Sequence, residues 1–164
     1  MPALTKATAI EKLNLIAHIE GGYFSETFRT AEMVHTEREG GERHRLTSIF
    51  YMLTDEGRKG AFHMNKSDIV HYFQGGSTLT YYIIHPDGQL EIVKLGSNLA
   101  DGDVMQMEVK GGCWKGTYLP EGEFGLLGEA VAPGFDYRDM VIAKKEDIQA
   151  QFPAIFDQIA HMFE

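Results

Sequence analysis

Cysteine is almost absent from this chain: Cys113 is the single one among 164 residues. A lone cysteine cannot form an intramolecular disulfide, and such cysteine usage is typical of proteins kept in a reducing compartment. Cys113 stands beside Trp114 with no obvious base next to it, so we interpret it as a small apolar filler rather than a nucleophile. We therefore expect a cytoplasmic protein whose fold does not depend on disulfides.

Long apolar runs are missing as well. No stretch approaches the roughly 18 apolar residues of a membrane helix, and the first residues lack the apolar core of a signal peptide. The net charge is -9, which disfavours binding to the phosphate backbone of nucleic acids. We thus expect neither a membrane nor a nucleic acid as a partner. The positive charges of the first half are interpreted as solvated loop charges: Arg29, Arg38, Arg43, Arg45, Arg58 and Lys59.

Glycine is plentiful, with 18 residues spread over turn positions rather than pooled in a linker. Short alternating segments, separated by turn signals about every 8–12 residues, predict an all-β sandwich or barrel. Helical patterns are confined to the two ends, at about residues 5–14 and 145–163, and the strands fill about residues 20–143. Residues 36–46 are polar and we expect a mobile loop there. At this length the whole chain, 1–164, fits one domain.

Residues 60–76, with the sequence G-A-F-H-M-N-K-S-D-I-V-H-Y-F-Q-G-G, mix ionisable side chains with large apolar ones. Because residues i and i+2 share a face of a strand, His63 and Asn65 point to one side. In the strand that follows, Asp68 and Tyr72 lie on one face and His71 lies on the other. Ionisable side chains that lie among apolar ones in this way predict a ligand pocket rather than an entirely hydrophobic core.

Glu26 stands in the alternating segment 23–30, just after a turn marked by Gly21 and Gly22. Alternation puts Glu26 on the same face as Phe24 and Phe28, where an unpaired carboxylate would be costly. Either the register differs and Glu26 faces water, or Glu26 lies in a pocket with a partner. The sequence leaves both alternatives open.

Two segments resemble the signatures of the cupin superfamily. Residues 60–75 match the first signature, a glycine followed by His-x-His, an acidic residue and a closing glycine, and residues 102–115 match the second, which begins with Gly-Asp. Together with H-I-E-G-G-Y-F-S-E-T-F-R, S-I-F-Y-M-L and V-A-P-G-F-D-Y-R-D-M, they resemble an uncharacterised single-domain cupin family over about residues 10–143. The resemblance implies a jelly-roll barrel (a double-stranded β-helix), commonly paired into dimers, so a homodimer is expected.

The chain departs from the cupin pattern at the metal site that this resemblance implies. His63 matches the first metal-binding histidine and Asp68 the acidic ligand. Asn65, however, stands at the second histidine, and Lys115 stands at the histidine of the second motif. A lysine ammonium at a ligand position disfavours a bound cation, and alternation puts His71 on the strand face opposite Asp68. We therefore expect no metal and no other cofactor.

The leading hypothesis is a metal-independent isomerase or epimerase that acts on a carbohydrate-like or nucleotide-sugar-like substrate. Cupin-fold sugar epimerases without metal, which the chain resembles in its expected fold, use a His–Asp pair to remove a proton next to a carbonyl. Histidine bases and carboxylate partners make the catalytic candidates His63, Asp68, Glu26 and His71. The candidates for substrate binding are Tyr23, Arg29, Ser48, Tyr51, Asn65, Tyr72, Trp114, Lys115 and Glu129.

Two alternatives stay open. The same pocket suits a non-catalytic ligand-binding or sensor protein. It also suits a divalent-metal enzyme of the dioxygenase kind, with His63, His71 and carboxylates as an atypical ligand set. In each case the ligand is a small molecule inside the barrel, and Lys115 predicts that this molecule is polar or anionic.

Overall fold

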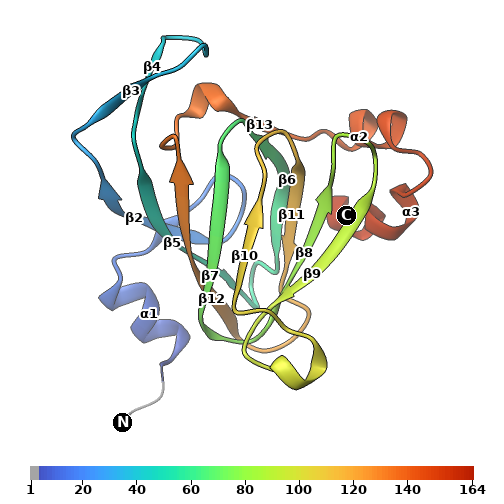
Figure 1. Cartoon of the computed structure of the whole chain (residues 1–164). Coiled ribbons are helices and arrows are strands. Elements are labelled where there is room, and N and C mark those ends of the chain that lie inside the picture. The colour runs from blue at the N-terminus through green and yellow to red at the C-terminus, as the bar shows by residue number, and fades with distance from the viewer. Residues whose placement is uncertain (1–3) are drawn as a thin grey trace.

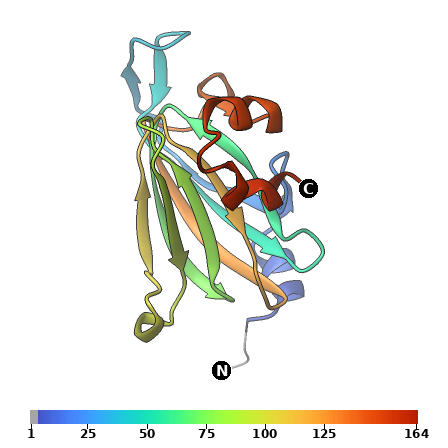
Figure 2. The ribbon, with the colours of Figure 1, turned by 90° about the vertical axis from the view of Figure 1, so that its right-hand side faces the viewer.

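The computed structural model of the chain describes residues 4–164, and these residues form two facing β-sheets (Figures 1 and 2). The first sheet has the strand order β1 (Ile16–Ala17), β2 (Tyr23–Arg29), β5 (Thr47–Thr54), β12 (Phe124–Ala132), β7 (Asp68–Gly76), β10 (Gln106–Val109). The second has the order β13 (Met140–Ile142), β6 (Lys59–Asn65), β11 (Trp114–Tyr118), β8 (Leu79–Ile84), β9 (Leu90–Leu95). Neighbouring strands within each sheet are antiparallel.

The core lies between the two sheets, because alternate residues of each strand point inward. Leu53 and Leu127 from the first sheet meet Leu79, Tyr81 and Ile83 from the second, and all five are buried. From β5 to β8 and from β9 to β13 successive strands alternate between the two sheets, which is the connectivity of a jelly roll rather than of a simple meander. Among residues 4–164, hydrogen bonds do not close the two sheets into one continuous barrel. The expected all-β jelly-roll class is confirmed in this two-sheet form.

Short helices stand at both ends, as the sequence predicts. Helix α1 (Lys6–Lys12) begins after Thr5, whose hydroxyl accepts a hydrogen bond from the Thr8 amide, and its Ala9 packs against the outer side of the first sheet. Helices α2 (Lys145–Gln151) and α3 (Phe156–Ile159), with the 3-10 turn η3 (Ala160–Phe163), cover the outer side of the second sheet (Figure 2). Two further 3-10 turns are η1 (Leu99–Asp101) and η2 (Tyr137–Asp139). None of the helices within residues 4–164 has the length and apolar character that crossing a membrane requires.

The polar stretch 36–46, expected to be a mobile loop, instead completes a hairpin of β3 (Met33–His35) and β4 (Glu42–His44) that projects from the molecule (Figure 1). Arg43 anchors this hairpin to η2: its Nε and Nη2 atoms each donate to a carboxylate oxygen of Asp139 at 2.8 Å. Arg38 donates to the same carboxylate at 2.9 Å. The interpretation of Arg43 as a solvated charge was wrong, because its side chain is only 1% exposed.

Replacing Arg43 with Met is expected to lower the free energy of unfolding by about 3 kcal/mol, the low end for a broken buried ion pair, because Asp139 keeps Arg38. The matched control is Arg45→Met, which removes an exposed ion pair to Glu32 and is expected to cost no more than about 1 kcal/mol. Urea denaturation of both variants measures the difference. Equal losses would show that the Arg43–Asp139 pair does not anchor the hairpin.

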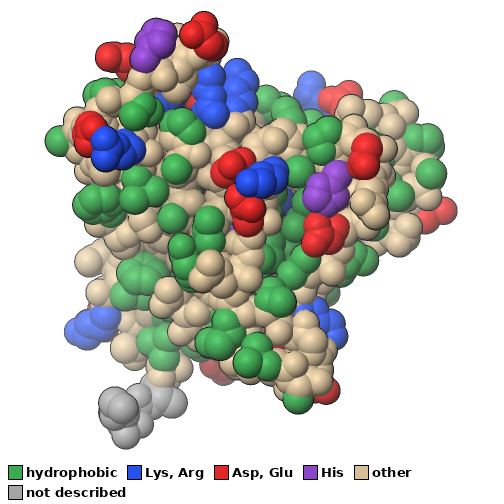
Figure 3. All heavy atoms as spheres, viewed as in Figure 1, with side chains coloured by type: hydrophobic (Ala, Val, Ile, Leu, Met, Phe, Trp, Pro, Cys, Tyr) green, Lys and Arg blue, Asp and Glu red, His purple; other side chains and the backbone are tan. Residues whose placement is uncertain are grey.

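The outer face of the first sheet carries scattered hydrophobic side chains (Figure 3). Among its exposed members are Phe28 and Tyr72, which lie on β2 and β7. The homodimer expected from the sequence stays a prediction.

Candidate functional site

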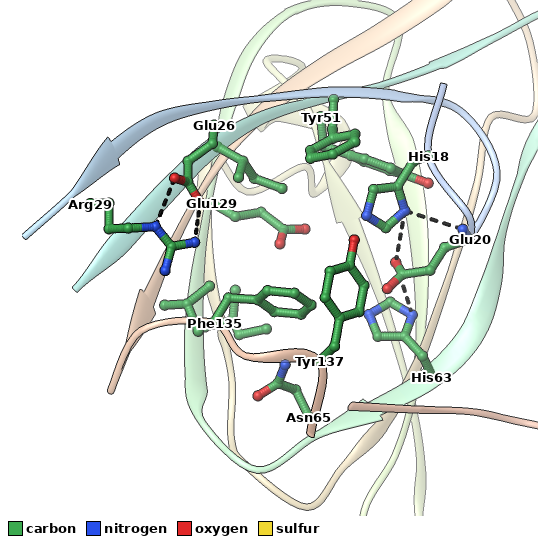
Figure 4. Close-up of a pocket in the computed structure, with 14 residues that line it drawn as sticks. His18, Glu20, Glu26, Arg29, Tyr51, His63, Asn65, Glu129, Phe135 and Tyr137 are labelled. Atoms are coloured by element: carbon green, nitrogen blue, oxygen red, sulfur yellow. Dashed lines mark hydrogen bonds and ion pairs between the residues drawn. The ribbon is translucent and has the colours of Figure 1, made fainter. Parts of the chain in front are cut away.

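A cavity of about 350 Å³ opens between the sheets, at the end of the core nearest β2 and β6 (Figure 4). Its size and its mainly apolar walls with a few converging polar groups are typical of small-molecule sites. It is lined by His18, Glu20, Phe24, Glu26, Arg29, Ile49, Tyr51, His63, Asn65, Ile69, Glu129, Val131, Phe135 and Tyr137.

The turn of residues 18–22 brings His18 and Glu20 to the cavity. The Gly21 amide donates to the His18 carbonyl at 3.1 Å, and the Ala61 amide on β6 donates to the Glu20 carbonyl at 2.6 Å. Gly21 has φ +95, and a Cβ there would lie 2.5 Å from the carbonyl oxygen of Lys59. Only glycine fits such a close approach at positive φ, and the turn expected at Gly21 and Gly22 is confirmed.

Gly21→Ala is expected to destabilise the protein by about 1–3 kcal/mol and to displace the neighbouring Glu20, because the backbone strain is combined with a clash. Gly57→Ala is the matched control, since a Cβ at Gly57 meets no atom within 4 Å. Thermal unfolding of both variants, with chemical-shift mapping of the Glu20 amide, tests this expectation. An undisturbed Glu20 resonance in the Gly21 variant would contradict it.

Glu20 is a buried carboxyl, only 9% exposed, placed between two histidines (Figure 4). Its Oε2 atom lies 3.3 Å from Nδ1 of His63 and 3.8 Å from Nδ1 of His18. Burial raises the pKa of Glu20 to about 8, with Lys115 opposing the shift and Glu129 adding to it. Glu20 is therefore mostly protonated at neutral pH and titrates near it.

Both histidines beside Glu20 are neutral. Burial, reinforced by the nearby Lys115 ammonium, lowers the pKa of His63 to about 3. Burial likewise lowers the pKa of His18. Nδ1 of His63 lies 2.9 Å from the Ala61 carbonyl oxygen, and Nδ1 of His18 lies 3.1 Å from the Glu20 amide nitrogen. In each ring the other nitrogen, Nε2, faces the cavity (Figure 4).

A second polar cluster of Lys115, His71 and Glu129 lies behind the cavity wall. Lys115 Nζ is 2.7 Å from His71 Nε2 and 3.3 Å from Glu129 Oε1, and the Lys115 and His71 side chains are almost wholly buried. Burial alone would raise the pKa of Glu129, but Lys115 and His71 together hold it well below its usual range. Glu129 therefore presents a permanent negative charge to the cavity, matched by the ammonium behind it.

Glu26 and Arg29 form a bidentate ion pair at the cavity edge, with distances of 2.9 and 2.6 Å. Simple alternation would put the two side chains on opposite faces. A bulge between Glu26 and Phe28 shifts the register of β2 and brings them to the same side. Each alternative for Glu26 holds in part: the register of β2 does shift and the side chain is 39% exposed, yet Glu26 lines the cavity edge and has Arg29 as its partner. Phe135 and Tyr137, stacked edge to face at 4.9 Å, close the other side.

The cavity gathers some of the sequence-predicted residues: Glu26, Arg29, Tyr51, His63, Asn65 and Glu129. His71 and Lys115 lie just behind it, in contact with Glu129. Asp68 lies elsewhere: its side chain is 51% exposed and accepts a hydrogen bond from the Gly111 amide. The carboxylate next to His63 is thus Glu20, and neither Asp68 nor Glu26 takes that position.

Four predicted binding residues also lie outside the cavity. Tyr72 points outward from the first sheet, because it shares the outer face with Asp68. Tyr23 packs in the cluster under α1, and Trp114 packs in the cluster under the C-terminal helices. The Ser48 hydroxyl donates to the backbone carbonyl of Glu129.

Sequence reasoning missed other lining residues: His18, Glu20, Phe24, Ile49, Ile69, Val131, Phe135 and Tyr137. The available signal was the pair of segments H-I-E-G-G and P-G-F-D-Y, which carried the family resemblance but no assigned chemistry. A histidine and a carboxylate two residues apart, directly before two glycines, indicate a backbone turn that directs both side chains to one place.

The residues present do not fit a cupin-type metal site. Asn65, at the position of the second histidine, uses its side-chain oxygen to accept a hydrogen bond from the Ser67 amide. Lys115 lies in the strand position next to His63, and its ammonium occupies the place of a ligand. Within residues 4–164, no group of three or more His, Cys, Asp or Glu side chains is placed to hold a metal ion.

Two antiparallel sheets in jelly-roll order around an internal ligand-sized cavity define a cupin-type protein. A sequence profile described as "Cupin superfamily (DUF985)" matches residues 7–143, and the chain belongs to this family. An uncharacterized protein of Saccharomyces cerevisiae is 38% identical over 151 residues, which cover 84% of this chain and 75% of the yeast protein.

Solved structures agree with this assignment. A protein of Shewanella oneidensis superposes with a TM-score of 0.89 at 28% identity, covering 99% of both chains. A hypothetical protein from Leishmania major gives a TM-score of 0.86 at 29% identity, covering 94% of this chain and 98% of the other. Oxalate decarboxylase from Bacillus subtilis, at 18% identity and a TM-score of 0.52, matches 84% of this chain and 39% of its own length and shares the fold alone.

Proposed function

We propose that this cupin binds a small, polar, carbohydrate-like molecule and isomerises or epimerises it by proton transfer at a carbon next to a carbonyl. The observation that carries the proposal is the buried Glu20 carboxyl, 3.3 Å from His63 at the wall of a ligand-sized cavity. Glu20 replaces the Asp68 of the sequence hypothesis in the carboxylate–histidine pair.

Glu20 is the general base. Removing a proton from carbon needs a base stronger than an exposed carboxylate, and a carboxyl whose pKa is raised to about 8 meets this need near neutral pH. After proton abstraction, the same protonated carboxyl returns the proton to carbon. The neutral imidazoles of His18 and His63 are the hydrogen-bonding groups beside the developing enolate.

The charges around the cavity favour a neutral polar ligand over an anionic one. Arg29 is paired with Glu26, and Lys115 is paired with Glu129, so neither cation is left to attract a phosphate or carboxylate. Phe135 and Tyr137 offer aromatic faces to the apolar side of a sugar.

Proton exchange in heavy water tests the function. The protein is incubated in D2O with a panel of aldohexoses, ketohexoses and nucleoside-diphosphate keto sugars, and NMR follows deuterium at the carbon next to the carbonyl. We expect deuterium uptake with at least one panel member, and loss of this uptake in Glu20→Gln. A panel member that binds in calorimetry, with no deuterium uptake by any member, would overturn catalysis and leave the non-catalytic binding protein.

A further inference from the structure

The two imidazoles next to Glu20 are held in opposite tautomers by backbone groups. The backbone N–H of Glu20 donates a hydrogen bond to Nδ1 of His18 at 3.1 Å. Because a backbone N–H can only donate, Nδ1 of His18 accepts and carries no proton. The proton of the His18 ring is therefore on Nε2. A carbonyl oxygen can only accept, so Nδ1 of His63, 2.9 Å from the Ala61 carbonyl, carries the proton of that ring. Nε2 of the neutral His63 is left with a free lone pair.

The two Nε2 atoms face the same cavity (Figure 4). One wall thus presents a hydrogen-bond donor from His18 and an acceptor from His63. The Glu20 carboxyl lies between the two rings on the side of their Nδ1 atoms, with Oε2 3.8 Å from Nδ1 of His18 and 3.3 Å from Nδ1 of His63. Both rings lie within 4 Å of the same Glu20 oxygen, so a ligand that satisfies both imidazoles must offer an acceptor and a donor a few atoms apart.

We infer that the substrate is an α-hydroxy carbonyl compound, an open-chain aldose or ketose, whose carbonyl oxygen accepts from His18 Nε2–H and whose adjacent hydroxyl donates to His63 Nε2. The inference rests on the proposed function and names its substrate class. Two donors in these positions would suit a carboxylate, and a diol could bond to both rings but lacks the carbonyl that makes the neighbouring C–H acidic. One of each matches a carbonyl next to a hydroxyl.

Every proton that moves in the proposed reaction starts and ends on the substrate or on Glu20. The Glu20 carboxylate takes the proton from the carbon that bears the hydroxyl. The electron pair of that C–H bond forms the C=C bond of an enediolate, and the carbonyl π pair moves to the oxygen that His18 holds. The hydroxyl proton then moves to this neighbouring oxygen, and Glu20 returns its proton to the former carbonyl carbon. Aldose and ketose interconvert with no oxidant or reductant.

The tautomers are measured directly by long-range ¹H–¹⁵N NMR of histidine-labelled protein at pH 7. The variants His18→Gln and His63→Gln assign the two rings by loss of their signals. We expect a proton on Nε2 of His18 and on Nδ1 of His63. The same tautomer in both rings, or a charged ring at either position, would overturn the inference without reference to any substrate.

Binding of an enediol mimic tests the substrate class. The probe is D-arabinonohydroxamate, with D-arabitol and D-arabinonate as controls that lack the carbonyl–hydroxyl pair or carry a charge. We expect the hydroxamate to bind at least about 10-fold more tightly than either control, as one well-placed hydrogen-bond pair allows. We expect a similar loss in His18→Leu and His63→Leu, and near-retention in the Gln variants, which keep a donor and an acceptor. Equal binding of the three compounds would overturn the inference.

The outcomes also separate this inference from the proposed function. Selective hydroxamate binding without deuterium exchange on any sugar would remove the catalytic function and keep the ligand class. Deuterium exchange on carbonyl compounds that lack the adjacent hydroxyl would keep the function and overturn the ligand class. Thermal unfolding shows whether each Leu variant is folded. If one of them is not, the Gln variants and the tautomer measurement test the ligand class in its place.

Discussion

Glu20→Gln is expected to lower kcat/KM for carbon–hydrogen exchange by about 10²- to 10⁴-fold, the usual contribution of a positioned general base. The substitution keeps the shape of the side chain and removes its ability to accept a proton. Glu121→Gln, on an exposed residue outside the cavity, is the matched control and is expected to leave turnover unchanged. A Glu20→Gln enzyme with wild-type turnover would rule out Glu20 as the base.

The pH profile carries a second signature of the same residue. Because the carboxylate is the active form, kcat/KM of the wild type is expected to rise with pH and to level off above about 8, the pKa of Glu20. The groups around Glu20 are the neutral His18 and His63, the ion-paired Lys115 and Glu129, and Tyr51, whose pKa burial raises well above its usual range. With His63 at about 3, none of the histidines beside Glu20 accounts for a transition near 8. A profile that is flat between pH 6 and 9 would contradict the assignment.

Stability should respond in the opposite direction to activity. The pKa of Glu20 is raised from its ordinary 4.5 to about 8, so the folded state binds a proton more tightly than the unfolded state. The free energy of unfolding therefore falls as pH rises from about 4.5 through about 8. Glu20→Gln removes this penalty and is expected to be more stable than the wild type at pH 8–9. Loss of both activity and stability in this variant would point to a structural role instead.

Lys115→Met is expected to destabilise the protein by about 3–5 kcal/mol, the largest effect on folding foreseen here. Lys115 is buried, and its ammonium is the partner of the buried Glu129 carboxylate at 3.3 Å. Without it, Glu129 keeps a charge that neither water nor a cation neutralises. The loss should be greatest at neutral and alkaline pH and should shrink in acid, where protonation of Glu129 relieves the unpaired charge.

The double variant Lys115→Met/Glu129→Gln is the control for this pair. Removing both charges takes away the desolvated carboxylate as well as its partner, so the double variant is expected to recover much of the lost stability. Urea denaturation at pH 5 and pH 8 measures all three proteins. If the double variant is no more stable than the single one, packing of the lysine stem accounts for the loss, and the ion pair does not.

Sequence alone was enough for the architecture. Alternation and glycine turns predicted an all-β sandwich or barrel with helices at its ends, because strand period and turn chemistry are local properties of the chain. The jelly roll itself was implied by the resemblance of two segments to cupins. The inward direction of His63 and Asn65 and the outward direction of Asp68 and Tyr72 relative to His71 follow from the same period. The departure from a metal site at Asn65 and Lys115 follows instead from the identity of these two residues.

What only the tertiary structure decided is which charged groups meet. Glu20 reaches His63 through a turn in which Gly21 lies against Lys59 of β6, and no local pattern encodes that approach across some forty residues. Arg29 joins Glu26 because a bulge in β2 breaks the alternation on which the sequence argument relied. Asp68 belongs to the same sequence motif as His63. It lies on the face of β7 opposite His71, however, and its side chain is therefore exposed to solvent. Which charged side chains pair, how deeply they are buried and how far their pKa values shift all depend on contacts between strands that are distant in the chain.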